Sequence, residues 1–259
     1  METQPIRFFH RGQVRTVTDA PITRTVLQYL REDAHCTGTK EGCAEGDCGA
    51  CTVVLGELQE DGSVGLKAVN ACIQFLPTLD GKALFTVEDV RGKDGTLHPV
   101  QEAMVECHGS QCGFCTPGFV MSLYALYENT DNQAPIPSRQ TICDSLTGNL
   151  CRCTGYRPII DAGERMFELP SPAGIDRTQL ADTLRKLQRK DTFSYAPVGT
   201  ENEPRFYAPR TASAFAAIKA AHPSIRILAG STDVGLWVTK QFRDLGDILY
   251  IGQVADLYA

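Results

Sequence analysis

Four cysteines constrain this chain more than any other feature of its sequence. Cys43, Cys48 and Cys51 follow the spacing C-x4-C-x2-C, and Cys72 lies further along the chain. This is the plant-type spacing of a [2Fe-2S] cluster, in which each iron takes two thiolates. Because such a cluster moves single electrons, the pattern indicates an electron carrier before it indicates a catalyst.

Glycines interrupt the same stretch at Gly42, Gly46 and Gly49. They can adopt positive φ and let backbone N–H groups approach the sulfurs, so we expect the loop to curl around the cluster. Structural zinc is the alternative, although zinc sites usually pair two short knuckles instead of three cysteines plus one. Disulfides are disfavoured because residues 1–11 are polar and mixed and do not form an apolar signal segment.

A second set of cysteines follows a different plan, with Cys112 and Cys115 in one loop and Cys151 and Cys153 in another. We expect each loop to join two helices, so that one cluster would connect two helical hairpins. C-x2-C alone also suits thioredoxin-like or zinc sites, but its combination with C-x-C favours a second iron–sulfur cluster. The expected helices are His98–Cys107, Pro117–Glu128, Ser138–Leu146 and Pro158–Glu168. The remaining cysteines are expected to be small buried hydrophobes: Cys36, Cys107 and Cys143.

Residues 1 to 90 show mostly β patterns. Two short alternating runs around Arg11-Gly12 predict a hairpin, and an amphipathic segment predicts one helix. The order of these elements suits a β-grasp core. The expected strands are Ile6–His10, Gln13–Val17, Thr52–Leu55, Gly65–Val69 and Ala83–Val87, and the expected helix is Thr25–Asp33.

Three stretches, Glu41–Val53, Ser110–Leu126 and Leu146–Ile160, resemble the iron–sulfur/flavin subunit of the molybdenum hydroxylases, and most of all the small subunit of bacterial xanthine dehydrogenases. The resemblance runs to the last residue and implies an α+β multidomain chain. It implies a β-grasp, ferredoxin-like [2Fe-2S] domain, a four-helix [2Fe-2S] domain and the truncated start of an α/β FAD-binding domain. The expected divisions are 1–90, 91–169, a linker at 170–203, and 204–259.

The resemblance also implies site residues. By motif, Cys43, Cys48, Cys51 and Cys72 would hold one cluster, and Cys112, Cys115, Cys151 and Cys153 the cluster nearer the molybdopterin. Gln111 matches a glutamine that contacts the molybdopterin in the family; the alternative is a loop residue that satisfies local backbone groups. No catalytic residue is expected on this chain.

The glycine loop at residues 230–235 would, by itself, be an ordinary strand-to-helix turn. The resemblance implies that it belongs to a segment that binds the FAD pyrophosphate. Asp233 has the alternative role of a helix cap. Since the sequence stops before the residues expected to hold the flavin ring and meet NAD, we expect FAD binding only in the intact assembly. The implied FAD residues are Ile227, Leu228, Ala229, Gly230, Ser231, Thr232, Asp233 and Val234.

The implied function is an electron relay in an oxidoreductase whose molybdenum site lies on a partner. Electrons from hypoxanthine or xanthine oxidation to urate would leave the molybdopterin of a large subunit, pass two [2Fe-2S] clusters to FAD, and reach NAD+. We expect a higher heteromeric assembly. The alternatives are the small subunit of an aldehyde or carbon monoxide oxidoreductase and, more remotely, a zinc-stabilised interaction module.

Composition narrows the partners and the location. The net charge of −6 disfavours nucleic acid and anionic membrane surfaces. No stretch approaches the roughly 18 apolar residues of a membrane span. We therefore expect neither nucleic acid nor membrane as a partner, and the cysteine-rich chain without a signal segment predicts a cytoplasmic protein.

Overall fold

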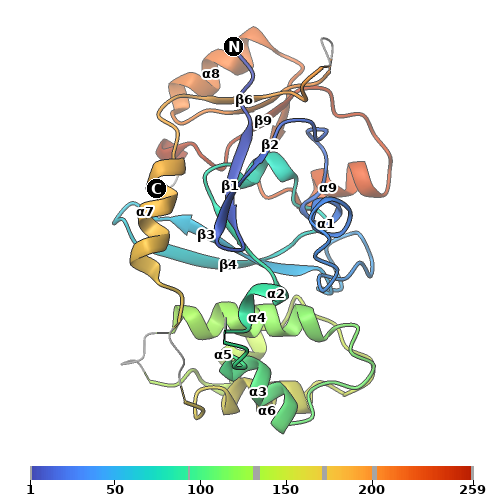
Figure 1. Ribbon diagram of the computed structural model, residues 1–259. Helices are drawn as coiled ribbons and strands as arrows, with labels where there is room; N and C mark the ends of the chain where they lie inside the picture. Colours follow the sequence, from blue (N-terminus) through green and yellow to red (C-terminus); the bar gives the residue numbers. More distant parts are fainter. Residues whose placement is uncertain (1, 93, 131–134, 171–173, 200–202, 258–259) are drawn as a thin grey trace.

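The structure of the protein is a computed structural model that describes residues 2–92, 94–130, 135–170, 174–199 and 203–257 (Figure 1). A sheet occupies the middle of the molecule. A group of helices lies on one side of it, and a smaller sheet with its own helices lies on the other (Figure 1). The cysteine loops belong to the middle sheet and to the helical group.

The middle sheet is built from the β-rich first part of the chain. Its strands are β1 (Ile6–His10), β2 (Gln13–Val17), β3 (Thr52–Leu58), β4 (Val64–Asn70) and β5 (Ala83–Phe85). Their order is β2-β1-β5-β3-β4, with β1 parallel to β5 and the other neighbours antiparallel. The predicted hairpin is confirmed: Arg11 and Gly12 have φ of 52° and 74°, as a two-residue type I′ turn requires.

The first helical segment of the chain packs against the core of this sheet. It begins as α1 (Val26–Gln28) and continues as a π-helical turn at Tyr29–Asp33. The hydroxyl of Thr25 accepts a hydrogen bond from the backbone N–H of Gln28, and the Gln28 side chain accepts one in return from the N–H of Thr25. This capping box fixes the start of the predicted helix, which is confirmed.

The fifth strand is shorter than the sequence predicted. We expected Ala83–Val87, but β5 ends at Phe85 because Thr86 turns the chain into the short helix α2 (Val87–Val90). The carboxylate of Asp89 accepts a hydrogen bond of 2.7 Å from the backbone N–H of Thr86. A local capping contact therefore outweighs the β-branched pattern of the sequence. A buried 3-10 turn at Leu76–Leu79 leads into the strand.

The segments predicted to be helical around the second cysteine set are helical, within a few residues of the expected bounds. They are α3 (Pro99–Glu106), α4 (Thr116–Asn129), α5 (Arg139–Ser145) and α6 (Arg157–Arg165). Every residue of α4 from Gly118 to Ala125 is buried, because this helix packs on β3 and β4 as well as on α3 and α5. No described helix has the length and apolar character required to cross a membrane.

The segment predicted as a linker, residues 170–203, carries two elements: helix α7 (Arg177–Leu187) and strand β6 (Phe193–Tyr195). After α7, the guanidinium of Arg189 binds the carboxylate of Asp80 with N–O distances of 2.6 and 2.9 Å. Bidentate pairing of this kind is geometrically specific. The segment therefore packs onto the fold as well as connecting its parts, and the domain boundaries stay predictions. Residues 171–173 and 200–202 of the expected linker lie outside the described residues.

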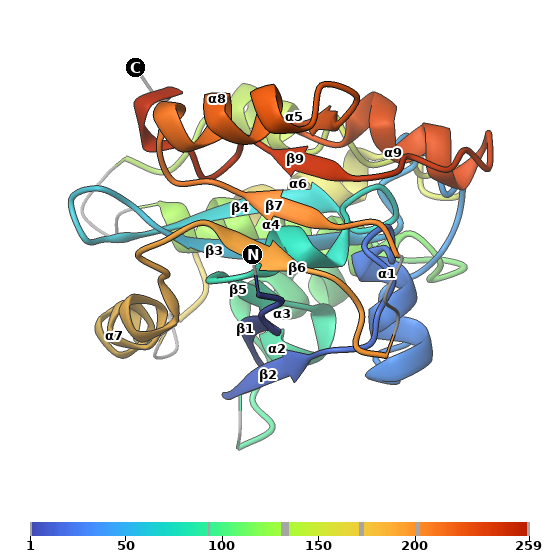
Figure 2. The same ribbon diagram turned by 90° about the horizontal axis from the view of Figure 1, so that it is seen from above.

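The second sheet follows the order β6-β7-β9-β8, with β7, β9 and β8 parallel. Viewed from above, α8 and α9 lie on the far side of the molecule from β2 (Figure 2). Phe193, Phe206 and Ile248 of this sheet share one apolar core with the middle sheet. The remaining elements are β7 (Phe206–Ala208), α8 (Ala212–Ala221), β8 (Arg226–Leu228), α9 (Thr232–Thr239), β9 (Ile248–Tyr250) and a 3-10 turn at Ala255–Leu257.

Candidate metal centres

The β3–β4 pair positions the buried half of the first cysteine set. Cys51 directly precedes β3 and Cys72 follows β4, and the antiparallel register places Thr52 opposite Asn70. Both cysteines are buried. A hydrogen bond from the thiol of Cys72 lowers the pKa of Cys51, and the same contact, together with burial, raises the pKa of Cys72. The backbone N–H of Ala71 donates to the carbonyl of Cys51 at 3.3 Å, so the two cysteines lie side by side.

Cys43 and Cys48 form the half-buried part of the same loop. The backbone N–H groups of Glu45 and Cys48 each donate to the sulfur of Cys43 at 3.4 Å. Burial raises the pKa of Cys43, but these backbone donors outweigh burial and hold the pKa below its ordinary value. Gly42 is required here, since a Cβ would lie 2.7 Å from the sulfur of Cys48. The loop thus favours a thiolate at Cys43.

The second cysteine set is brought together by the two helical connections. Cys112 and Cys115 lie between α3 and α4, and Cys151 and Cys153 lie between α5 and α6. Burial and a hydrogen bond with Cys151 raise the pKa of Cys115 to about 12. Phe114 N–H and the thiol of Cys153 lower the pKa of Cys112. The inner pair is thus Cys115 with Cys151, and the outer, exposed pair is Cys112 with Cys153.

Nearby side chains also contact the second cysteine set. The hydroxyl of Thr154 lies 3.2 Å from the sulfur of Cys151, and the N–H of Cys151 donates to the Tyr156 hydroxyl at 3.1 Å. Burial raises the pKa of Cys151, but hydrogen bonds from the hydroxyl and backbone of Thr154, from the Cys115 thiol and from the Cys153 backbone together outweigh it, so that the pKa is lowered. Tyr156 has a φ of 70°, a conformation that a bulky residue adopts only under constraint.

The thiols fit the iron–sulfur interpretation better than a zinc site. All the cysteines are free, and the predicted ligands lie in two sets of four. A [2Fe-2S] centre takes two thiolates on each iron, which the three-plus-one spacing of the first set and the two cysteine loops of the second supply, whereas zinc sites usually pair two short knuckles. Among the described residues, no group of three or more His, Cys, Asp or Glu side chains is arranged around a single ion position.

Other predicted residues have less defined surroundings. Gln111 is exposed beside Cys112. The expected full burial holds for Cys36, whose sulfur lies 3.7 Å from Nε2 of His10. The two other unassigned cysteines, Cys107 and Cys143, are only partly buried, so the expected burial does not hold fully for them.

The predicted FAD segment spans β8 and the start of α9. Ile227 is 42% exposed on β8, at the edge of the second sheet. Ser231 has a φ of 64° and is the N-cap position of α9, so the capping position is not Asp233, which lies in the first helical turn. The hydroxyl of Ser231 is buried without a hydrogen-bond partner among the described residues. The segment is thus a strand-to-helix turn with an unpaired hydroxyl.

Two contacts were not foreseen from the sequence. Lys240, at the end of α9, donates a hydrogen bond of 2.6 Å to the carbonyl of Cys43 and pairs with Glu45 at 3.5 Å. Asn149 is buried between the two cysteine loops. Lysine and asparagine in loops are common, so only their place in the fold distinguishes them. The asparagine lies one residue before Leu150, within the stretch that carries the family resemblance.

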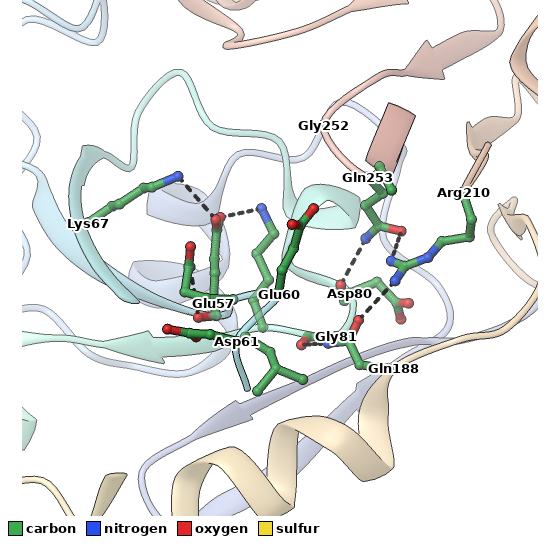
Figure 3. Close-up of a pocket in the computed structure, with 14 residues that line it drawn as sticks. Glu57, Glu60, Asp61, Lys67, Asp80, Gly81, Gln188, Arg210, Gly252 and Gln253 are labelled. Atoms are coloured by element: carbon green, nitrogen blue, oxygen red, sulfur yellow. Dashed lines mark hydrogen bonds and ion pairs between the residues drawn. The ribbon is translucent and has the colours of Figure 1, made fainter. Parts of the chain in front are cut away.

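A cleft of about 580 Å³ lies between the β3–β4 hairpin and the second sheet, and no cysteine lines it (Figure 3). Three of its charged side chains pair within it: Glu57 contacts Lys82 at 2.7 Å and Lys67 at 3.3 Å. The guanidinium of Arg210 contacts the side-chain oxygens of Gln188 and Gln253. These contacts join the parts of the fold, and we assign the cleft no part in the chemistry of the cysteines.

Comparison with known protein families places both cysteine sets in iron–sulfur regions. Residues 8–75 match the family described as the 2Fe-2S iron-sulfur cluster binding domain. Residues 86–164 match the family described as the [2Fe-2S] binding domain. The first match contains Cys43 to Cys72, and the second contains Cys112 to Cys153.

Relatives that match larger parts of the chain agree with these two matches. A xanthine dehydrogenase of Drosophila subobscura is 35% identical over 91% of this chain and 20% of its own length. Aldehyde oxidase 1 of Rattus norvegicus is 46% identical over 62% of this chain and 12% of its own length. The chain thus spans a fifth or less of these two relatives. In the structure of quinoline 2-oxidoreductase from Pseudomonas putida 86, a chain that is 30% identical aligns with a TM-score of 0.52, over 71% of this chain and 96% of that one.

Proposed function

The chain belongs to the iron–sulfur region of the molybdenum hydroxylases, and we propose that it is the electron-transfer part of such an enzyme, with one [2Fe-2S] cluster in each cysteine set. When bound, each cluster would accept and release one electron at a time. The first would be held by Cys43, Cys48, Cys51 and Cys72, and the second by Cys112, Cys115, Cys151 and Cys153.

The observation that carries this proposal is the grouping of eight cysteines into two sets of four, each within a match to a [2Fe-2S] family. Cys51 and Cys72 lie at the same end of the paired strands β3 and β4, in one loop system with Cys43 and Cys48, and the two helical connections carry the pairs Cys112 with Cys115 and Cys151 with Cys153. Each set supplies the ligands that two irons require.

The chain's own residues would hold, polarise and shield these ligands. Backbone N–H groups directed at Cys43, and the hydroxyl of Thr154 at Cys151, would stabilise negative charge on the sulfurs, which shifts a reduction potential upward. The burial of Cys51 and Cys72 would keep water from one side of the first cluster. No residue of this chain is assigned to substrate chemistry.

For the whole enzyme we propose oxidation of hypoxanthine or xanthine to urate with NAD+ as acceptor. The molybdopterin would lie on a large partner chain, with Gln111 as a contact, in a higher heteromeric assembly. FAD would be held in part by residues 227–234, where the unpaired hydroxyl of Ser231 favours a polar ligand. The xanthine dehydrogenase relative supports the purine substrate, and the aldehyde oxidase relative makes aldehyde oxidation the second candidate. The free cysteines suit a cytoplasmic location.

Metal analysis of anaerobically purified protein tests the proposal. We expect about four irons and as many acid-labile sulfides per chain, with a red-brown visible spectrum. A colourless, zinc-containing protein would contradict it. In the intact assembly, turnover of purines compared with aldehydes separates the two substrate candidates.

A further inference from the structure

Asn149 connects the two cysteine loops through its side-chain amide. It is 4% exposed. Its Nδ2 donates to the carbonyl oxygen of Gly49 and to the hydroxyl of Thr52, both at 3.1 Å. Its Oδ1 accepts a hydrogen bond of 2.6 Å from the hydroxyl of Ser122 on α4. One buried amide therefore ties the first loop, the start of β3 and α4 to the second loop.

The backbone next to Asn149 makes a direct link between the two ligand sets. The N–H of Leu150 donates to the carbonyl oxygen of Cys48 at 2.9 Å. Cys48 is a proposed ligand of the first cluster, and Leu150 immediately precedes Cys151, a proposed ligand of the second. A single peptide hydrogen bond thus connects residues of the two sets.

The loops have no room to approach more closely or to slide. Gly49 has a φ of 69°, and a Cβ on it would overlap the carbonyl oxygen of Gly148 and the side chain of Asn149. Buried polar groups that are all hydrogen-bonded are geometrically demanding, because a small shift leaves a donor or acceptor unpaired. The loops therefore meet at a fixed separation.

We propose that Asn149 is a positioning residue that sets the separation of the two clusters. The inference rests on the proposed function, since it requires both cysteine sets to be loaded. Without the amide, the Gly49 carbonyl and the hydroxyls of Thr52 and Ser122 lose their shared partner. The hydrogen bond between Leu150 and Cys48 then loses its support, while all eight cysteines remain in place.

The test is Asn149→Ala in the full-length holoprotein, read by electron paramagnetic resonance of the dithionite-reduced state. Two reduced clusters each carry an unpaired spin, and their interaction appears as line splitting or faster spin relaxation that weakens steeply with distance. We expect iron and sulfide at the wild-type level, with the spin–spin interaction lost or clearly reduced.

Asn129→Ala is the matched control. The side chain of Asn129, at the end of α4, donates a hydrogen bond of 2.8 Å to the carbonyl of Leu66 on β4. It joins the same helix to the same sheet without touching a cysteine loop, so the spin–spin interaction should stay at the wild-type value. An equal change in both variants would show general loosening between the helices and the sheet, and would overturn the assignment to Asn149.

Outcomes for the inference and for the proposed function are separable. A wild-type protein that lacks either cluster refutes the proposed function. A fully loaded Asn149→Ala protein with an unchanged spin–spin interaction refutes the positioning role alone. If the Asn149→Ala protein does not bind its clusters, the Ser122→Ala variant provides the test, because it removes only the hydroxyl that orients the amide. We then expect a smaller reduction of the spin–spin interaction than for Asn149→Ala. An unchanged spin–spin interaction in Ser122→Ala would overturn the inference.

Discussion

Gly118, near the start of α4, packs against the carbonyl oxygen of Gly49 so closely that a Cβ on it would overlap that oxygen. The helical group can therefore approach the first cysteine loop only because this position has no side chain. In an unconstrained helix, alanine is more stable than glycine by about 1 kcal/mol. Because of this close packing, glycine is the more stable residue at Gly118 and alanine the less stable one.

Gly118→Ala is expected to destabilise the protein by about 1–3 kcal/mol, the usual range for overpacking a dense core. Gly148→Ala is the control, because a Cβ there meets nothing within 4 Å. It should leave the stability within about 0.5 kcal/mol of wild type. Denaturant unfolding of both variants measures the difference, and equal midpoints would show that the close contact does not exist in solution.

A buried ion pair anchors β3 to β5 near the second sheet. The side chains of Lys82 and Glu57 are 11% and 24% exposed and lie 2.7 Å apart. Burial acts to lower the pKa of Lys82, but Tyr250 and Glu57 outweigh it and raise the pKa above its ordinary value. Lys82→Met removes the more buried partner and leaves Glu57 paired only with the exposed Lys67, so it should cost about 2 kcal/mol.

The control for that prediction is Lys67→Met. Lys67 pairs with the same carboxylate but is 60% exposed, so its removal should change stability by less than about 1 kcal/mol. The double variant Lys82→Met with Glu57→Leu should recover most of the loss, because no charge is then left buried. Equal effects of the two lysine variants in denaturant unfolding would contradict the burial argument.

The sequence was informative where local spacing determines structure. The Arg11-Gly12 turn, the helix capped by Thr25 and the helices around the second cysteine set could all be predicted, since their signals lie within a few residues. The strand at Ala83–Val87 was overextended, because the capping contact between Thr86 and Asp89 competes with the β pattern. The competing contacts, a helix cap and a strand pairing, differ by only a few tenths to about 1 kcal/mol. A pattern of residue types does not show which of the two is more stable.

The contacts that join the parts of the fold were out of reach of sequence reasoning. Asn149 meets Gly49 across 100 positions of the chain, and Arg189 meets Asp80 across 109. No periodicity carries such pairings. For the candidate site, the spacing along the chain was enough to group the cysteines into two sets. The arrangement of the cysteines within each set depends on the β3–β4 register and on the way the two helical loops face each other.

His10 makes stability depend on pH. It is 1% exposed, and burial lowers its pKa below the ordinary value, although Asp89 and the carbonyl of Leu84 act in the opposite direction. Well above about pH 6.5, the ordinary histidine pKa, the side chain is neutral in both the folded and the unfolded state. As the pH falls below that value, the unfolded state takes up the proton more readily, so stability is lost until the pH passes the folded-state pKa.

His10→Gln should remove this contribution while keeping a donor for the carbonyl of Leu84. Melting temperatures of wild type and variant, measured in parallel from about pH 8 to pH 5.5, should converge or cross as the pH falls through the ordinary histidine range. Curves that stay parallel over this interval would show that the proton uptake lies elsewhere.

Cys43→Ser separates the two cysteine sets. Because the ligands proposed for the first cluster come from one loop and the adjoining end of β4, losing one thiolate should abolish that cluster and leave the helical set intact. Iron should fall from about four to about two atoms per chain, with one of two paramagnetic signals retained on reduction. Cys143→Ser, at a partly buried cysteine outside both sets, should keep the full iron content. Full iron in Cys43→Ser, or halved iron in Cys143→Ser, would mean that the ligands have been assigned wrongly.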